Sequence, residues 1–229
     1  MRAVPGYRAL QLLLDFGRGA ERRQSALLRI RASASLFQPF GTTWPNRYPR
    51  IFAELRDRLG QAASVRLLSF GCSTGEEVAS LRAHFPNAFI KGVDISPERI
   101  AICRGRLLDA EAGRTQFEIG VSVRGEDAAV YDAVLAMAVF RHGQLGDYAV
   151  TENRLLDFDR FERAVTDLAR TVRPGGYFVL RHSNFRFTDT AVAAEFETVG
   201  YAQCVSPLFD RSGARLPDQA REAALFHKR

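Results

Sequence analysis

The 229-residue sequence contains little lysine, little cysteine and no long apolar run. Lysine occurs only at Lys91 and Lys228, so the net charge of +6 comes from arginines that are scattered along the chain among acidic residues. Interleaved charge is typical of a solvated surface, whereas a nucleic-acid-binding domain gathers its basic residues on one face. We therefore expect no nucleic acid among the partners.

The cysteines and histidines show no metal-binding spacing. The three cysteines, Cys72, Cys103 and Cys204, form no C-x-x-C pair, and their odd number argues against a disulfide framework. The four histidines do not cluster, so no metal is expected. The short apolar run ALQLLL near the N-terminus is too brief to span a bilayer and has no small-residue cleavage site behind it. These features favour a cytoplasmic protein without a membrane partner.

From residue 65 onward, short apolar runs alternate with helical patterns, which predicts βαβ units. The pattern Ser96-Pro97 is typical of a helix start, and the most regular helical pattern begins near Phe158 and is expected to stop at RPGG, residues 173–176. One more helix is expected in the tail. Strands are expected at residues 65–70, 88–93, 116–121, 131–136 and 177–180, with weaker ones at 201–205 and 223–227. The fold class predicted is α/β, a Rossmann-like, doubly wound, mostly parallel sheet with an N-terminal helical extension.

Residues 1–60 differ from the remainder and are interpreted as a helical N-terminal extension or lid, followed by a Rossmann-like domain over residues 61–229. Helical patterns lie at residues 10–16, 27–30 and 51–59. Between them stands LFQPFGTTWPNRYPR, residues 36–50, which is too rich in proline, glycine and aromatics to be one regular element. It is either a packed connector with its aromatics in the core or a lid over the site.

The stretch LLSFGCSTGEEVASL, residues 67–81, places a glycine-rich turn between a strand and a helix. A phosphate-cradling loop needs Lys and Ser/Thr after its last glycine, where this chain has Glu76 and Glu77. A dinucleotide fingerprint needs a glycine at the place of Ser73. The two carboxylates repel phosphate and favour a ligand without phosphates and with positive character, such as a sulfonium nucleoside.

The same turn fits G-x-S-x-G, the nucleophile elbow of α/β-hydrolases. Ser73, Asp157 and His182 occur in the triad order of that fold. However, no HGGG-type loop precedes the turn. Only one predicted strand precedes it, whereas the hydrolase fold has several there. Asp94 also stands about twenty residues on, at the tip of the second strand, where nucleotide-binding sites place an acid for ribose hydroxyls. A nucleophilic Ser73 is disfavoured and stays an alternative.

Four motifs in series resemble those of class I S-adenosylmethionine-dependent methyltransferases: LLSFGCSTGEE, KGVDIS, YDAVLAMAVFRHG and LARTVRPGGYFVL. The resemblance covers roughly residues 65–182, and the first motif is most similar to that of chemotaxis receptor methyltransferases. It implies S-adenosylmethionine as cofactor, with the glycine turn around its methionine and ribose, Asp94 on the ribose hydroxyls and Ile95 on the adenine. The cofactor-binding residues implied are Gly71, Cys72, Ser73, Thr74, Gly75, Asp94, Ile95, Ser122, Val123, Ala136 and Met137.

The sequence departs from the family pattern at three points. Ser69 and Ser122 stand where acids are common, and AMAVF replaces both the D/N-P-P-Y/F segment of amino-methylating nucleic-acid enzymes and the arginine-asparagine pair of the chemotaxis enzymes. Receptor glutamates therefore do not follow as the substrate. The acceptor expected is a small molecule methylated on O or N, and the oligomeric state is not readable.

A hydroxyl or ammonium acceptor needs a base, and histidine is the side chain suited to that role at neutral pH. His142 and His182 both follow predicted strands at the edge where such sheets bind ligands, so both are candidate catalytic residues. The alternatives to a methyltransferase are a hydrolase using Ser73 and a Rossmann-like domain that binds the cofactor without catalysis.

Overall fold

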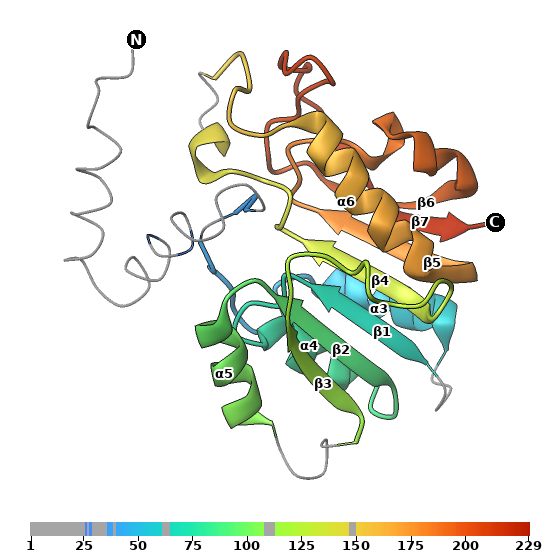
Figure 1. Ribbon diagram of the computed structural model, residues 1–229. Coiled ribbons are helices and arrows are strands. Elements are labelled where there is room, and N and C mark those ends of the chain that lie inside the picture. Colours follow the sequence, from blue (N-terminus) through green and yellow to red (C-terminus); the bar gives the residue numbers. More distant parts are fainter. Residues whose placement is uncertain are drawn as a thin grey trace.

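The computed structural model describes residues 36–38, 40–60, 65–107, 113–146 and 150–229, together with Ala26 and Leu28. The helices expected at residues 10–16 and 27–30 lie outside the described residues, apart from the helical Leu28. The described chain forms one seven-stranded sheet with helices on both of its faces (Figure 1). The Rossmann-like α/β sheet expected from the sequence is confirmed.

The strands lie in the order β3-β2-β1-β4-β5-β7-β6, in which β1 to β5 are mutually parallel and β7 is antiparallel to both of its neighbours. The order reverses between β1 and β4. Open α/β sheets bind ligands beyond the carboxyl ends of their strands at such a reversal. The strands are β1 (Arg66–Phe70), β2 (Phe89–Asp94), β3 (Thr115–Ile119), β4 (Tyr131–Met137), β5 (Val172–Arg181), β6 (Phe196–Gln203) and β7 (Arg221–Lys228).

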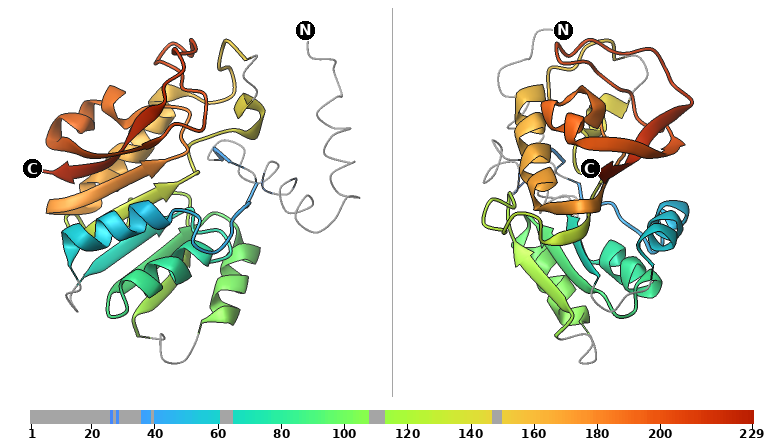
Figure 2. Two further views of the ribbon diagram at one scale, coloured as in Figure 1. Left: turned by 180° about the vertical axis from the view of Figure 1, so that it is seen from behind. Right: turned by 90° about the vertical axis from the view of Figure 1, so that its right-hand side faces the viewer.

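The helices form two layers, one on each face of the sheet (Figure 2). Along β4, Ala133 and Leu135 belong to one core, whereas Val134 and Ala136 belong to the other, because successive side chains of a strand point to opposite faces. The first core contains side chains of α3 (Pro49–Leu59), α4 (Glu76–His84) and α5 (Pro97–Arg106), and the second contains those of α6 (Phe158–Thr171).

Helix α3 belongs to the stretch interpreted as an N-terminal extension. It buries Ile51, Phe52 and Leu55 in the same core as α4 and β1. This part of the extension is therefore built onto the sheet, and the division of the chain at residue 60 stays a prediction.

The start of α5 follows the chemistry expected for it. Ser96 is the N-cap residue, its hydroxyl oxygen accepts from the Arg99 backbone N at 3.3 Å, and Pro97 occupies the first helical position. A hydroxyl at this position satisfies one of the helix's unpaired N–H groups. The cap fixes the short connection from β2 to α5, and with it the direction of the β2 tip.

The expectation that RPGG separates α6 from the next strand is wrong. Strand β5 begins at Val172, directly after α6, and includes residues 173–176. The register against β4 shifts there, from Tyr131 opposite Val172 to Ala133 opposite Tyr177, so the extra residues form a bulge in the strand.

The prediction of one more helix in the tail is also wrong. Only two short 3-10 turns occur there, η3 (Phe187–Asp189) and η4 (Ala191–Glu195), and β6 begins directly after them, earlier than residue 201. The Thr190 hydroxyl donates to the Phe187 carbonyl at 2.7 Å. That bond occupies a carbonyl that a continuing helix would use.

We predict that Gly176→Ala destabilises the protein by about 1–3 kcal/mol, the usual cost of overpacking. A Cβ at this position would lie 2.9 Å from two backbone oxygens, those of Arg173 and Asp132. Urea denaturation measures the change in the free energy of unfolding. Gly113→Ala is the matched control, because a Cβ there meets nothing within 4 Å. Equal stability of the two variants would show that the bulge is not tightly packed.

Candidate functional site

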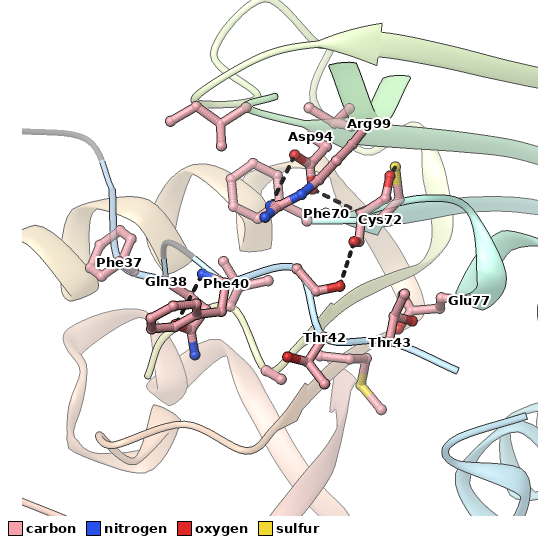
Figure 3. A pocket seen from close by; sticks show the side chains of 18 of the residues that line it. Phe37, Gln38, Phe40, Thr42, Thr43, Phe70, Cys72, Glu77, Asp94 and Arg99 are labelled. Carbon is pink, nitrogen blue, oxygen red and sulfur yellow. Dashed lines mark hydrogen bonds and ion pairs between the residues drawn. The ribbon is translucent and has the colours of Figure 1, made fainter. Parts of the chain in front are cut away.

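A pocket lies beyond the carboxyl ends of β1, β2 and β4, at the point where the strand order reverses (Figure 3). It is lined by the turn after β1, the end of β2, the residues after β4 and most of the stretch formed by residues 36–38 and 40–48. We call this last stretch the covering segment; it passes along the arrowhead ends of the parallel strands in Figure 1. The pocket holds roughly 910 Å³ of space, its open mouth included.

Three residues other than glycine have a left-handed backbone within three residues of a strand end at this edge. Their φ angles are 52° at Ser73 after β1, 62° at Ala138 after β4 and 51° at His182 after β5. Such a conformation costs an L-residue about 1–2 kcal/mol. Strained positions gather at functional sites, and these three mark the edge that bears the pocket.

The glycine turn needs its glycines for conformation and for space. Gly71 has a φ of 77° and Gly75 one of 94°, and a Cβ on Gly71 would lie 2.4 Å from Val139 Cγ2. The Gly71 and Cys72 backbone N–H groups both donate to the Val93 carbonyl, at 2.7 and 3.0 Å. These bonds hold the turn against the tip of β2.

Asp94 is 5% exposed and lies at the tip of β2, where the sequence predicts the ribose-binding acid. Its Oδ2 accepts from the Ser73 backbone N and its Oδ1 from the Ser96 backbone N, both at 2.9 Å. Arg99 Nη1 lies 3.8 Å from Oδ1. The carboxylate is therefore fixed in the pocket wall, and an ionised carboxylate has further lone pairs that accept from ligand hydroxyls.

The structure brings together part of the predicted cofactor set. Thr74 and Gly75 line a neighbouring hollow between α4 and α5, and Ser122 and Val123 line another beside α6, so Val121 takes their place in the pocket. Ala136 is fully buried within β4. The predicted residues that do line the pocket are Gly71, Cys72, Ser73, Asp94, Ile95 and Met137.

Ser73 is held as a structural residue of the turn. Its hydroxyl donates to the Gly41 carbonyl of the covering segment at 2.9 Å. Asp157, the predicted triad acid, caps α6 by accepting from the Arg160 backbone N at 2.7 Å. In the described chain, Ser73, Asp157 and His182 make no hydrogen bond with one another. No hydrolase triad is assembled.

His182 lies beside the pocket wall, in contact with two residues of the covering segment. The Tyr48 hydroxyl is 2.8 Å and Arg47 Nη2 3.4 Å from its Nδ1. Because a guanidinium only donates, this contact assigns Nδ1 as the acceptor and the proton to Nε2. Burial, followed by the charges of Arg181, Arg47 and Arg141, lowers the pKa of His182 to about 3.

His142 is not among the lining residues of the pocket. Its backbone N donates to Asn184 Oδ1 at 2.8 Å, and its Nδ1 accepts from the Gln144 backbone N at 3.3 Å. These bonds place it at the start of the short 3-10 turn η2 (Gly143–Gly146). His182 is not among the lining residues either, but it contacts two of them, Arg47 and Tyr48. The structure therefore gives different surroundings to the two histidines that the sequence proposes for one role.

Sequence reasoning missed Glu77 as a site residue, because two acids at a helix start are explained by the helix dipole alone. Its carboxylate lines the pocket and accepts from the Ser69 hydroxyl at 2.8 Å. Burial raises the pKa of Glu77 to about 7, against the opposing effects of Ser69 and Arg47. Ser69 stands where the family commonly has an acid. The absence of a carboxylate at that position was the sequence signal that could have pointed to Glu77.

The covering segment combines both interpretations of residues 36–50. Phe37 and Tyr48 are buried in the two cores, as a packed connector requires. Arg160 donates to the Leu36 carbonyl at 2.9 Å, and its guanidinium lies 3.9 Å from the Phe37 ring centroid. Phe40 and Trp44, by contrast, are 39% and 50% exposed and line the pocket. The segment is anchored at its ends and covers the pocket with its middle.

The described residues lack two other kinds of site. None of their helices is long and apolar enough to cross a membrane. They also contain no group of three or more His, Cys, Asp or Glu side chains placed to hold a metal ion.

Comparison with known proteins matches residues 68–178 to a family described as a methyltransferase domain. The chain is 32% identical over 169 residues to the probable biofilm formation methyltransferase WspC of Pseudomonas putida, a match covering 58% of this chain and 39% of that protein. It is 28% identical over 78 residues to the malonyl-[acyl-carrier protein] O-methyltransferase of Bacillus cytotoxicus, a match covering 34% of this chain and 27% of that protein. These matches span less than half the length of either relative.

Solved structures with a similar arrangement include CalS10, an amino pentose methyltransferase from Micromonospora echinaspora with its cofactor bound, at 24% identity and a TM-score of 0.43 over 61% of this chain and 51% of that one. The [4+2]-cyclase SpnF has 18% identity and a TM-score of 0.49, and the match covers 70% of this chain and 62% of that one.

The family match covers the four motifs of the sequence, and the strand order places their glycine turn and acid at one edge of the sheet. The family expected from the sequence is thereby confirmed. Residues 68–178 of the chain form a methyltransferase domain.

Proposed function

We propose that this chain transfers a methyl group from S-adenosylmethionine to a small-molecule acceptor, at oxygen or nitrogen. The observation that carries the proposal is the Asp94 carboxylate, fixed beside the glycine turn inside a covered pocket. A carboxylate there accepts from a ribose diol, whereas the two glutamates after the turn disfavour a phosphate.

The residues around the pocket suit each part of the cofactor. Asp94 lies at one end, and Glu77 lies away from it on the other side of the turn (Figure 3). Glu77 supplies a carboxylate for the methionine ammonium group, and Arg47 supplies a guanidinium for the methionine carboxylate. Arg47 lines the same pocket and is held by a bond to the Thr42 carbonyl at 2.9 Å.

When bound, S-adenosylmethionine supplies a methyl group on a sulfonium that leaves as a neutral thioether. The protein's contribution is to hold the acceptor in line with that methyl and to exclude water, which lowers the barrier by several kcal/mol, on the order of the proximity effect. The covering segment closes the pocket for this purpose. His182 contacts the lining residues Arg47 and Tyr48, and with a pKa of about 3 it is neutral at physiological pH and only a weak proton acceptor.

A small acceptor is favoured over a macromolecule because Phe40 and Trp44 of the covering segment line the pocket and narrow the access to it. A cytoplasmic location is supported by the free thiols of Cys72, Cys103 and Cys204.

The direct test is calorimetry with S-adenosylhomocysteine, followed by turnover with S-adenosylmethionine and the small-molecule fraction of a cell extract. We expect saturable binding, and Asp94→Ala to weaken it by about 1–3 kcal/mol, the range for polar partners left unsatisfied. Asp127→Ala, at an exposed acid, is the control and should bind as the wild type does. Affinity unchanged in a folded Asp94→Ala variant contradicts the ribose role. Binding without any turnover would favour the non-catalytic alternative.

A second prediction concerns Glu77 and pH in the ligand-free protein. Its folded pKa of about 7 lies above the unfolded value of 4.5, so the stability it contributes is complete below pH 4.5 and is lost as the pH rises through 7. Glu77→Gln should therefore match the wild type at about pH 4 and exceed its unfolding free energy by about 3 kcal/mol at about pH 8.5. Urea denaturation at the two pH values checks this. A difference in unfolding free energy that is the same at both pH values would mean that the Glu77 carboxyl is exposed to solvent.

A third prediction concerns the covering segment. Trp44 is the only tryptophan, it lines the pocket, and Arg47 lies 4.2 Å from its ring centroid. Binding of S-adenosylhomocysteine should shift its fluorescence emission, since a ligand on Arg47 changes the field at the indole. Trp44→Phe provides the blank. An unchanged spectrum with unchanged hydrogen exchange across residues 36–50 would mean that the segment does not respond to the ligand.

A further inference from the structure

Hydrogen-bond donors outnumber acceptors at the end of the pocket near β5. Arg47 and Tyr48 of the covering segment line the pocket there, and His182 after β5 and Arg141 after β4, which are not among its lining residues, lie next to them. The Nε atoms of Arg47 and Arg141 are buried and have no hydrogen-bond partner in the described chain. Buried guanidinium groups are normally paired, because an unpaired buried charge is costly.

The acids near this cluster are already engaged. Glu222 is ion-paired with the buried Arg181. Glu77 accepts from Ser69 and is the acid whose charge interacts with Arg47. For Arg141, no acid of the described chain offsets its burial; only the Tyr48 oxygen does so, and burial and Arg47 together lower its pKa. Arg141 therefore carries a charge that an incoming anion would stabilise.

The cofactor does not account for both arginines. Its methionine portion has one carboxylate, and Arg47, which lines the pocket beside the glycine turn, is assigned to it. Arg141 follows β4 by four residues and approaches η2, with its Nη2 3.8 Å from the place of a Cβ on Gly146. In the chain it follows the lining residues Ala138 and Val139.

His182 adds a neutral donor to the same place. With Nδ1 occupied by Tyr48 and Arg47, its Nε2 carries the proton, and within the described chain only Nδ1 makes side-chain hydrogen bonds. The left-handed φ of 51° shows that the backbone holds this ring in place at a cost. A fixed N–H beside a guanidinium is a site for an oxygen that carries negative charge.

We propose that the methyl acceptor carries an anionic oxygen group, a carboxylate or a phosphate, bound by Arg141 with a hydrogen bond from His182 Nε2. The inference rests on the proposed methyltransferase function and names the class of its acceptor. The apolar part of such an acceptor faces the ring of Phe40, which lines the pocket and lies 3.7 Å from the place of a Cβ on Gly143 of η2.

The test uses the full chain saturated with S-adenosylhomocysteine, and reads Trp44 fluorescence and thermal unfolding. The probes are acetate, benzoate and phenyl phosphate, each titrated to high millimolar concentration, with acetamide and benzamide as the neutral counterparts. We expect saturable binding of at least one anion and binding of its neutral counterpart that is about ten-fold weaker or more, as for a lost charge-assisted hydrogen bond. Binding by benzoate alone identifies a carboxylate, and binding by phenyl phosphate alone a phosphate.

Arg141→Gln should weaken the anion by about 10- to 100-fold and leave the affinity for S-adenosylhomocysteine unchanged. Arg154→Gln, at a surface arginine that is 80% exposed, is the matched control and should change neither. If no anion binds, if the amides bind equally well, or if Arg141→Gln weakens S-adenosylhomocysteine instead, the inference is wrong. Failure of S-adenosylhomocysteine itself to bind would refute the proposed function, which separates the two outcomes.

Discussion

The hydrogen bond from the Ser73 backbone N to the Asp94 carboxylate joins the turn after β1 to the tip of β2, and the pocket depends on it. Ser73 has a left-handed backbone that costs about 1–2 kcal/mol, and its other polar atoms help to offset that cost. Its carbonyl accepts from the Cys103 thiol of α5 at 3.2 Å, and its hydroxyl donates to Gly41 of the covering segment. One residue thereby connects a strand tip, a helix and the roof of the pocket. This explains a serine within a glycine turn without giving it any covalent role.

The two ends of the pocket differ in their electrostatics. At the cofactor end, Glu77 is buried with its pKa raised to about 7, so it is ready to ionise when a cation arrives. Arg47 lies near enough to Glu77 to lower its pKa, and on the far side of Arg47 lie the neutral His182 and the positively charged Arg141. The pocket therefore suits a ligand pair in which the positive group lies near α4 and the negative groups lie near the ends of β4 and β5.

The sequence predicted most of the sheet, since apolar runs and helical periodicity report burial directly. It also predicted Asp94, because the strand before it and the Ser96-Pro97 helix start after it fix its place at an edge. It did not predict that RPGG would continue β5, because glycine and proline indicate a turn locally whereas pairing with β4 decides the bulge. Nor did it separate His142 from His182 or find Glu77 and Arg141. Those placements depend on side-chain contacts between segments far apart in the chain, which spacing alone does not encode.

The most direct measurement is a crystal structure of the complex with S-adenosylhomocysteine. The account requires the ribose hydroxyls within hydrogen-bond distance of the Asp94 carboxylate, the homocysteine ammonium beside Glu77, and the covering segment over the ligand. A ligand bound instead in the hollow between α4 and α5, or a ribose that faces away from Asp94, would contradict it.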